Sequence, residues 1–321
     1  MRKSGLLLTA FLPLIAVLMA GDFYRQKLVL AATAQRTILV HGHRGSRATR
    51  PENTLPAFQF AIDHGADVLE MDLAVTKDNV LVISHSPFLV QPPLLDSGHE
   101  RICKGPITEP TAIHAMTLEQ VEQFDCGTAN AAFPHQLGVP GTRVATFDQV
   151  LDLLAANPKI QLNVETKSYP NHPELTPDPA GFVKLIVDAI HRHHADEGRI
   201  ILQSFDFRTL IEMRKQDATI RLSALVSTPD GDAWMGLTDH NKDFVHVHDL
   251  TGAEIISPEA SLVTPEAVAA AHKAGMQVVP WTVNKPEEWK RLADAGVDAI
   301  ISDDPAALLA WLRVQSQALH N

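Results

Sequence analysis

Cysteine is scarce in this chain, whose 321 residues include only Cys103 and Cys126. A chain of this length can bury enough apolar surface to fold without disulfide or metal staples. The two cysteines share one segment that contains proline and glycine. They form a disulfide if the protein reaches an oxidising compartment, or otherwise stay as two free buried thiols, and both alternatives remain open here. Because neither cysteine has a partner at a metal-ligand spacing, we expect no redox or zinc chemistry.

A surplus of basic residues is also missing. The chain has 27 Lys and Arg residues against 38 Asp and Glu residues, which gives a formal net charge of −11. An anionic surface repels phosphate backbones, so we expect no nucleic-acid partner. A protein of this charge would need a local basic pocket or a bound cation to handle a small phosphate compound.

Long hydrophobic runs are confined to the N-terminus. Arg2 and Lys3 precede an apolar run over residues 6–19, which is shorter than the roughly 20 residues of a membrane-spanning helix. Small residues that suit a cleavage site follow this run. We therefore expect residues 1–34 to be a signal peptide, with an uncleaved anchor as the alternative, and the protein to be exported, either periplasmic or secreted. Membrane contact is expected only through that segment, and the oligomeric state is left unspecified.

Short β-type runs alternate with helical patterns through the rest of the chain. The first four β-type runs cover residues 37–43, 67–73, 80–85 and 160–167. Repeated βα units over about 285 residues, without a dividing linker, are typical of a parallel barrel. We predict one α/β domain over residues 35–321, a TIM (β/α)8 barrel with an inserted segment at about 86–141, after the second βα region.

Acidic residues share one face of two of these strands. Side chains alternate along a strand, so Glu70 and Asp72 point to one side while the apolar Met71 points to the other. The same alternation puts Glu165 and Lys167 on the polar face of a later strand. The apolar faces should pack on helices, and the polar faces should look into the barrel near the C-terminal strand ends, where barrel active sites lie.

Two interpretations account for this acidic cluster. Three converging carboxylates repel one another unless they are protonated or paired with positive charge. Because Glu70, Asp72 and Glu165 offer only oxygen ligands, the first interpretation is a bound divalent metal, either Ca²⁺ or Mg²⁺. The second is an internal salt-bridge network with Arg44 and Lys167.

Two histidines end strand-like runs near the same barrel rim. His43 and His85 are candidates for general acid and general base, because an imidazole titrates near neutral pH. Arg44 carries a planar set of donors that suits a phosphate. His41, one layer below His43 in the same run, is expected to be a hydrogen-bonded core residue.

Several short stretches together carry a family resemblance. In chain order they are His43-Arg44-Gly45, Pro51-Glu52-Asn53-Thr54, Glu70-Met71-Asp72, His85, Glu165-Thr166-Lys167, Gln203-Ser204-Phe205, Trp281-Thr282-Val283-Asn284 and Ser302-Asp303-Asp304-Pro305. This ordered set resembles the signature of the glycerophosphodiester phosphodiesterase family. The matches span nearly the whole chain after its N-terminal segment, and the combination is far more specific than any single triplet.

The resemblance implies a TIM barrel that hydrolyses glycerophosphodiesters to sn-glycerol 3-phosphate and an alcohol. It implies that His43 and His85 form the acid/base pair. It also implies that the divalent metal is held by Glu70, Asp72 and Glu165.

Four further roles are implied by the same resemblance. Arg44 would contact the phosphate, and Glu52 would orient Arg44 or the metal shell. Lys167 would meet the phosphate or a substrate hydroxyl, and Trp281 would form a wall of the pocket.

The chain departs from the family pattern at one place. The family usually has Asp after the second histidine, and this chain has Ser86. The change removes a carboxylate that could orient His85 or the metal shell. Two alternatives to the predicted hydrolase therefore stay open: a phospholipase D-like barrel that acts on intact phospholipid, and a non-catalytic glycerophosphodiester-binding protein.

Overall fold

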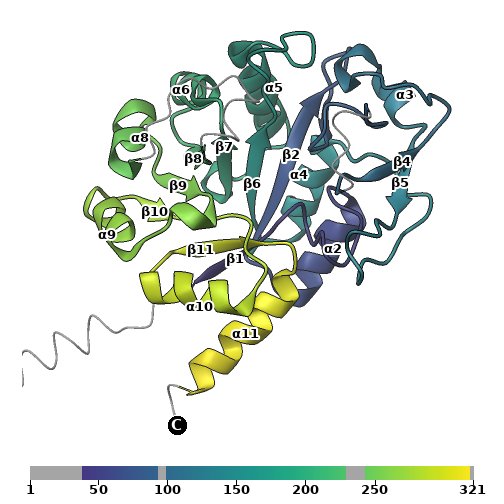
Figure 1. Cartoon of the computed structure of the whole chain (residues 1–321). Coiled ribbons are helices and arrows are strands. Elements are labelled where there is room, and N and C mark those ends of the chain that lie inside the picture. The colour runs from purple at the N-terminus through teal and green to yellow at the C-terminus, as the bar shows by residue number, and fades with distance from the viewer. Residues whose placement is uncertain (1–37, 93–98, 229–242, 319–321) are drawn as a thin grey trace, which may run out of the picture. The chain divides into compact units, whose positions relative to one another are not determined.

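Eight parallel strands form a nearly closed barrel in the computed structural model, which describes residues 38–92, 99–228 and 243–318 (Figure 1). Around the barrel the strands follow the order β10-β9-β8-β7-β6-β2-β1-β11. Their bounds are β1 Leu39–Gly42, β2 Val68–Val75, β6 Gln161–Thr166, β7 Ile200–Ser204, β8 Arg221–Val226, β9 Ile255–Pro258, β10 Gln277–Val278 and β11 Ala299–Ser302.

The barrel closes between β10 and β11 through irregular backbone hydrogen bonds. Asp298 N donates to Val278 O at 3.0 Å, and Ile301 N donates to Pro280 O at 3.0 Å. Val283 N then donates to Ile301 O at 2.9 Å. The predicted TIM barrel is therefore confirmed, with its last seam made by the chain just after the short strand β10.

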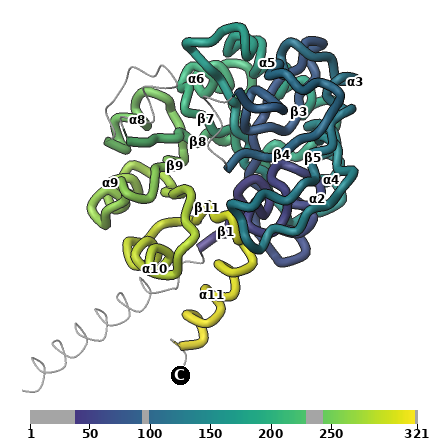
Figure 2. The backbone as a smooth tube through the Cα atoms, turned by 45° about the vertical axis from the view of Figure 1, so that its right-hand side comes forward, coloured from purple at the N-terminus to yellow at the C-terminus, as the bar shows by residue number. Residues whose placement is uncertain are grey.

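A helix follows each barrel strand and covers the outside of the ring (Figures 1 and 2). These helices are α2 Leu55–His64, α4 Phe147–Ala156, α5 Pro179–Arg192, α6 Phe207–Gln216, α8 Phe244–Thr251, α9 Pro265–Lys273, α10 Pro286–Ala295 and α11 Pro305–Ala318. Side-chain caps set several helix starts, as where Thr54 accepts from Ala57 N at the start of α2. Gly65 ends the same helix in the left-handed region at φ 92°.

The two faces of the strands separate as the alternation predicts. Leu69, Met71 and Leu73 of β2 belong to the main core between strands and helices. A separate small cluster fills the barrel interior; it contains Ile201, Ile255, Val279, Ala299 and Ile301. Glu70 and Asp72, on the inner face of β2, lie toward the rim and are buried. The polar side chains are thus held at one end of an otherwise packed barrel.

The insertion lies inside the second βα unit, between β2 and α4. It begins with β3 Leu81–Ile83, which pairs antiparallel with β2 as a hairpin, so the run at 80–85 is a strand but not a barrel strand. The other elements of the insertion are β4 Ile102–Lys104, a 3-10 turn at Ile113–Ala115, the helix α3 Leu118–Val121 and β5 Asp125–Thr128. Further 3-10 turns lie at Glu197–Arg199 and Ala260–Leu262.

This inserted segment has a core and a covalent link of its own. Ala74, Val82, Phe124 and other apolar residues form a cluster separate from the barrel core. A disulfide joins Cys103 of β4 to Cys126 of β5, which decides between the two cysteine alternatives. Figure 2 shows β4 and β5 outside the ring, on the side where α2 and α4 lie.

The N-terminal predictions fall outside the described part of the chain. Residues 1–34, read as a signal peptide or anchor, are not among the described residues. Within the described ranges, every helix is too short or too polar to span a bilayer.

Candidate active site

A strained turn after β1 begins the site. Arg44 has φ 49° and Gly45 has φ 85°, so two successive residues adopt the left-handed region. A Cβ on Gly45 would come within 2.7 Å of the Ala57 carbonyl carbon, so only glycine fits there. Arg44 N donates to Glu70 Oε2 at 2.8 Å. Backbone strain of this kind concentrates at functional sites, where the surrounding contacts maintain it.

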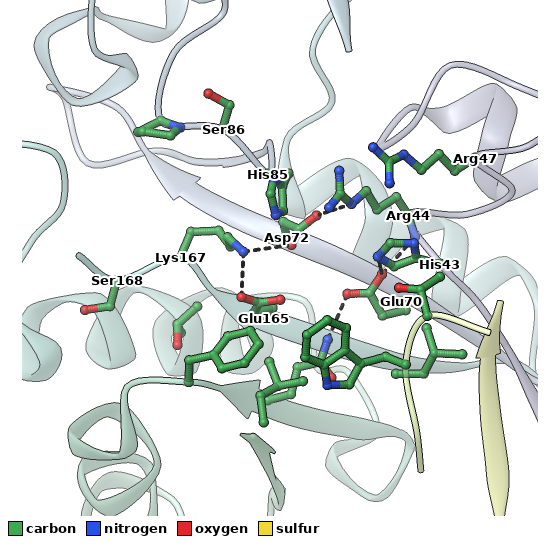
Figure 3. A pocket seen from close by; sticks show the side chains of 18 of the residues that line it. His43, Arg44, Arg47, Glu70, Asp72, His85, Ser86, Glu165, Lys167 and Ser168 are labelled. Atoms are coloured by element: carbon green, nitrogen blue, oxygen red, sulfur yellow. Dashed lines mark hydrogen bonds and ion pairs between the residues drawn. The ribbon is translucent and has the colours of Figure 1, made fainter. Parts of the chain in front are cut away.

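The three predicted carboxylates meet at the rim of the barrel. Their register explains this, because β2 and β6 pair with Glu70 opposite Asn163 and Asp72 opposite Glu165. Ligand oxygens of Glu70, Asp72 and Glu165 all lie within 4.8 Å of one another, and all three residues are buried. Figure 3 shows these carboxylates gathered from neighbouring strands.

Two amide side chains orient these carboxylates. Gln203 Nε2 donates to Glu70 Oε1 at 2.8 Å. Asn53 Nδ2 donates to Asp72 Oδ2, also at 2.8 Å. Both amides lie in stretches that carry the family resemblance, but sequence reasoning gave neither a role. Their position suggests that each fixes the direction in which a carboxylate presents its oxygens.

Lys167 and Arg44 lie beside the same carboxylates. Lys167 Nζ donates to Glu165 Oε1 at 2.7 Å and lies 3.6 Å from Asp72 Oδ1. Arg44 Nε lies 3.4 Å from Asp72 Oδ2, and its Nη1 donates to Glu52 Oε1 at 2.8 Å. Although burial opposes it, the charges of Lys167, His85 and Arg44 lower the pKa of Asp72. The salt-bridge interpretation therefore also has its contacts in this structure.

These two cations do not compensate the whole cluster. Burial and the charges of Asp72 and Glu165 raise the pKa of Glu70 well above its ordinary value. Burial also raises the pKa of Glu165 to about 7, against the lowering effect of Lys167. Full ionisation of the trio at neutral pH therefore calls for additional positive charge. A buried, all-oxygen donor set whose negative charge is only partly compensated fits a hard divalent cation.

His43 is held by a carboxylate from the barrel. Its Nδ1 lies 2.5 Å from Oδ1 of Asp303, the residue that directly follows β11. Although burial opposes it, His43 lowers the pKa of Asp303 to about 2, so this carboxylate is ionised and can only accept. Nδ1 of His43 must then donate to Asp303. The other ring nitrogen, Nε2, is left for proton transfer and lies 4.0 Å from Glu70 Oε2. Burial lowers the pKa of His43.

His85 is held in the same manner from the insertion. Its Nδ1 lies 3.3 Å from Glu100 Oε2. Burial, with the charges of Arg44 and Lys167, lowers the pKa of His85 to about 4. Ser86 does not share this contact: Figure 3 shows its side chain pointing away from His85, and its hydroxyl accepts from Phe88 N at 3.1 Å.

Asp303 and Glu100, the carboxylates that contact the two histidines, are further site residues that sequence reasoning missed. Asp303 stands in a quoted stretch directly after a predicted strand, and this position at a C-terminal strand end was a usable signal. Glu100 had no such signal. It lies in the insertion, far from any recognised stretch, and reaches His85 only through the fold.

One cavity of about 610 Å³ brings these groups together. Every predicted site residue except Glu52 lines it: His43, Arg44, Glu70, Asp72, His85, Glu165, Lys167 and Trp281. Glu52 lies behind Arg44 instead. Phe205 and Trp281 also line the cavity and meet edge to face at 5.5 Å, and Trp281 Nε1 donates to Ser257 O at 2.9 Å. The cavity can therefore hold an anionic group among the cations and imidazoles, with an apolar wall beside it.

Sequence comparison places this geometry in a known context. The model of the glycerophosphoryl diester phosphodiesterase family matches residues 43–307. A glycerophosphodiester phosphodiesterase from Caldanaerobacter subterraneus subsp. tengcongensis is 29% identical over 279 residues, covering 86% of this chain and 98% of that protein. One from Bacillus subtilis is 25% identical over 276 residues, covering 84% of each.

Solved structures share the fold. A structure from Silicibacter pomeroyi DSS-3 that bears the same family's name aligns with a TM-score of 0.77 at 29% identity, covering 88% of this chain and 95% of that chain. An Oleispira antarctica phosphodiesterase, solved with the product sn-glycerol-3-phosphate, aligns with a TM-score of 0.67 at 18% identity. That alignment covers 86% of this chain and 96% of the other, and it supports the barrel fold alone.

Proposed function

This chain belongs to the glycerophosphoryl diester phosphodiesterase family, and we propose that it hydrolyses glycerophosphodiesters to sn-glycerol 3-phosphate and an alcohol. One observation carries the proposal. His43, His85 and three buried carboxylates line a single cavity at the C-terminal rim of the barrel. A phosphodiester is anionic and resists attack, so a catalyst must neutralise its charge and also position a proton acceptor and a proton donor.

A divalent cation, Ca²⁺ or Mg²⁺, completes the proposed site, with Glu70, Asp72 and Glu165 as its protein ligands. The raised pKa of Glu70 supports this assignment, because a group that resists ionisation beside two carboxylates gains from a nearby cation. When bound, such a cation supplies positive charge to the phosphate and lowers the pKa of a hydroxyl that it contacts.

The two imidazoles carry the proton transfers in this proposal. One imidazole takes the proton of the attacking hydroxyl through Nε2 as the new oxygen–phosphorus bond forms. The other begins the step with a proton on Nε2 and gives that proton to the departing alcohol oxygen as the old bond breaks. The contacts of Nδ1 with Asp303 and Glu100 support this use of Nε2 in His43 and His85, and either imidazole can take either role in this arrangement.

The attacking hydroxyl is either a neighbouring glycerol hydroxyl or water. Attack by the glycerol hydroxyl forms a cyclic phosphate, which water then opens. Direct attack by water forms no such intermediate. Phosphorus NMR during turnover distinguishes the two routes, because only the first accumulates a cyclic phosphate signal.

The remaining residues bind the substrate in this proposal. Arg44 donates to a phosphate oxygen, and Glu52 holds its guanidinium, as their 2.8 Å contact supports. Lys167 meets the phosphate or a glycerol hydroxyl, and Trp281 forms the wall beside the alcohol group.

Export from the cytoplasm is the location we propose, directed by residues 1–34. The Cys103–Cys126 disulfide supports it, because such bonds persist in oxidising compartments. Sequencing the N-terminus of the protein recovered from periplasm or medium tests this location. A cytoplasmic protein that keeps residues 1–34 would contradict it.

The function is tested by measuring sn-glycerol 3-phosphate released from glycerophosphocholine and glycerophosphoethanolamine. The assays contain Ca²⁺ or Mg²⁺, with EDTA as the matched depletion. We expect release that EDTA abolishes and that returns when the cation is restored. Cleavage of intact phospholipid instead would support the phospholipase D-like alternative, and binding without product would support the binding protein.

A further inference from the structure

We infer that Glu100, which the insertion brings to the site, is the positioning residue of His85 and takes the place of the carboxylate that this chain lacks at Ser86. This inference rests on the proposed function, in which His85 transfers a proton. It assigns a specific task to the insertion, which would otherwise be a surface elaboration of the barrel.

The contact matches the one that holds the other histidine. Glu100 Oε2 lies 3.3 Å from His85 Nδ1, as Asp303 Oδ1 lies 2.5 Å from His43 Nδ1. The Glu100 side chain is 16% exposed, so bulk water reaches it poorly. A carboxylate accepts only, so each pairing keeps a hydrogen on Nδ1 and leaves Nε2 as the nitrogen that takes up or gives the reacting proton. The two imidazoles thus have the same arrangement.

Ser86 is unable to do this from its present position. Its hydroxyl accepts from Phe88 N at 3.1 Å, and its carbonyl accepts from Ser84 Oγ at 2.8 Å. Both groups therefore stabilise the turn that leads into the insertion. Within the described ranges, Glu100 is the carboxylate that contacts Nδ1 of His85.

The backbone around Glu100 is anchored from both sides. Arg47 Nη2, from the loop after β1, donates to His99 O at 2.6 Å. From the insertion, Asn130 Nδ2 donates to Glu100 O at 2.8 Å. Arg101 Nη1 donates to Asn53 O at 3.0 Å, on the same loop that orients Asp72. His99, Glu100 and Arg101 are thus each held by a hydrogen bond, so the position of Glu100 is fixed by its surroundings.

The test is a double-mutant cycle on kcat. Glu100→Gln keeps the shape of the side chain but removes the charge that selects the His85 tautomer. We expect kcat to fall roughly 10- to 100-fold, the scale on which misplacing a reacting group acts, with KM unchanged. In a His85→Ala background, Glu100→Gln should cause no further loss, because a positioning residue acts only through the group it positions. The control is Glu109→Gln, an exposed residue of the same insertion, which should match wild type.

The outcomes separate this inference from the proposed function. Additive losses in the cycle, or full kcat in folded Glu100→Gln while His85→Ala is impaired, would overturn the inference alone. Normal activity in His85→Ala would instead overturn the proposed role of that histidine.

A second measurement needs no variant to fold. Nitrogen-15 NMR of the wild-type protein, with labelled histidine, should show His85 protonated on Nδ1. The opposite tautomer would contradict the inference.

Discussion

The two histidines of the site are held by regions of very different construction. Asp303, which holds His43, directly follows β11, and His43 directly follows β1. His43 N donates to Ser302 O at 2.9 Å, so the two partners lie at the ends of adjacent barrel strands. Glu100, which holds His85, comes from the insertion, whose two-stranded sheet β4–β5 is closed by one disulfide. Equivalent contacts of the two histidines thus depend on a continuous barrel sheet in one case and on a small disulfide-linked sheet in the other. The barrel half should tolerate perturbation that the insertion half does not.

The largest expected effect comes from removing either imidazole. His43→Ala and His85→Ala should each lower kcat by roughly 10²- to 10⁴-fold, which is the usual contribution of a general acid or base. Steady-state kinetics on glycerophosphocholine measures both. A folded variant with near-wild-type kcat would show that the two histidines do not share the proton transfers.

Removing the barrel carboxylate should have the next largest effect. Asp303→Asn should lower kcat by at least roughly 10²-fold, because the amide no longer selects the His43 tautomer. The loss should exceed that of Glu100→Gln, since the contact of Asp303 is shorter and its partner Asn284 also donates to it, at 2.7 Å.

The adjacent residue supplies the matched control for that variant. Asp304 accepts from Ala307 N at 2.9 Å and caps α11, so Asp304→Asn should affect stability rather than kcat. Equal kcat losses in the two variants would argue that Asp303 acts only on the fold.

Breaking the disulfide should destabilise the insertion locally and leave the barrel unaffected. Cys103 and Cys126 are 23 residues apart in sequence, and a disulfide across a loop of this length stabilises the folded state by about 3 kcal/mol, because it constrains the unfolded chain. The double variant Cys103→Ser/Cys126→Ser should lose hydrogen-exchange protection in β4 and β5 while β1 and β11 keep theirs. Its kcat should fall several-fold because Glu100 is less well held. Equal loss of protection in both regions would contradict the account.

The smallest expected effect is on the pH dependence of stability, and it comes from His41, buried in the barrel below His43. Burial and the charge of Arg221 lower the pKa of His41 from 6.5 to about 3. The unfolded chain therefore binds a proton below pH 6.5 that the folded chain does not bind until about pH 3, so stability is complete above that window and falls as the pH drops through it.

Urea unfolding at about pH 7.5 and about pH 5 measures this difference. Wild type should lose more stability than His41→Gln between these two pH values, by up to about 2 kcal/mol. The control His135→Gln, at an exposed position, should lose as much as wild type. If His41→Gln has the same pH dependence of stability as wild type, protonation of His41 does not contribute to it.

The barrel half of the site could be predicted from sequence because periodicity decides it. Alternation along β2 placed Glu70 and Asp72 on the inner face, and the parallel register then brought Glu165 beside them. Asp303 was harder to predict. It stands next to Asp304 after a strand end, and only the turn geometry decides which of these two carboxylates faces the site.

The insertion half could not be predicted by that reasoning. The run at 80–85 reads as another strand, but its antiparallel pairing with β2 depends on a turn after β2 that has no clear periodicity. Glu100 reaches His85 across 15 residues through contacts from Arg47 and Asn130. Such tertiary contacts leave no local pattern, so the replacement for the missing carboxylate becomes visible only in the folded structure.

Diffraction from crystals grown with Mn²⁺ and sn-glycerol 3-phosphate tests the central claim most directly, since anomalous scattering locates the metal. We expect one anomalous peak bounded by Glu70, Asp72 and Glu165, with the phosphate between Nε2 of His43 and Nε2 of His85. Carboxylates that remain bonded to Lys167 without a metal peak, or a phosphate bound away from the two imidazoles, would contradict it.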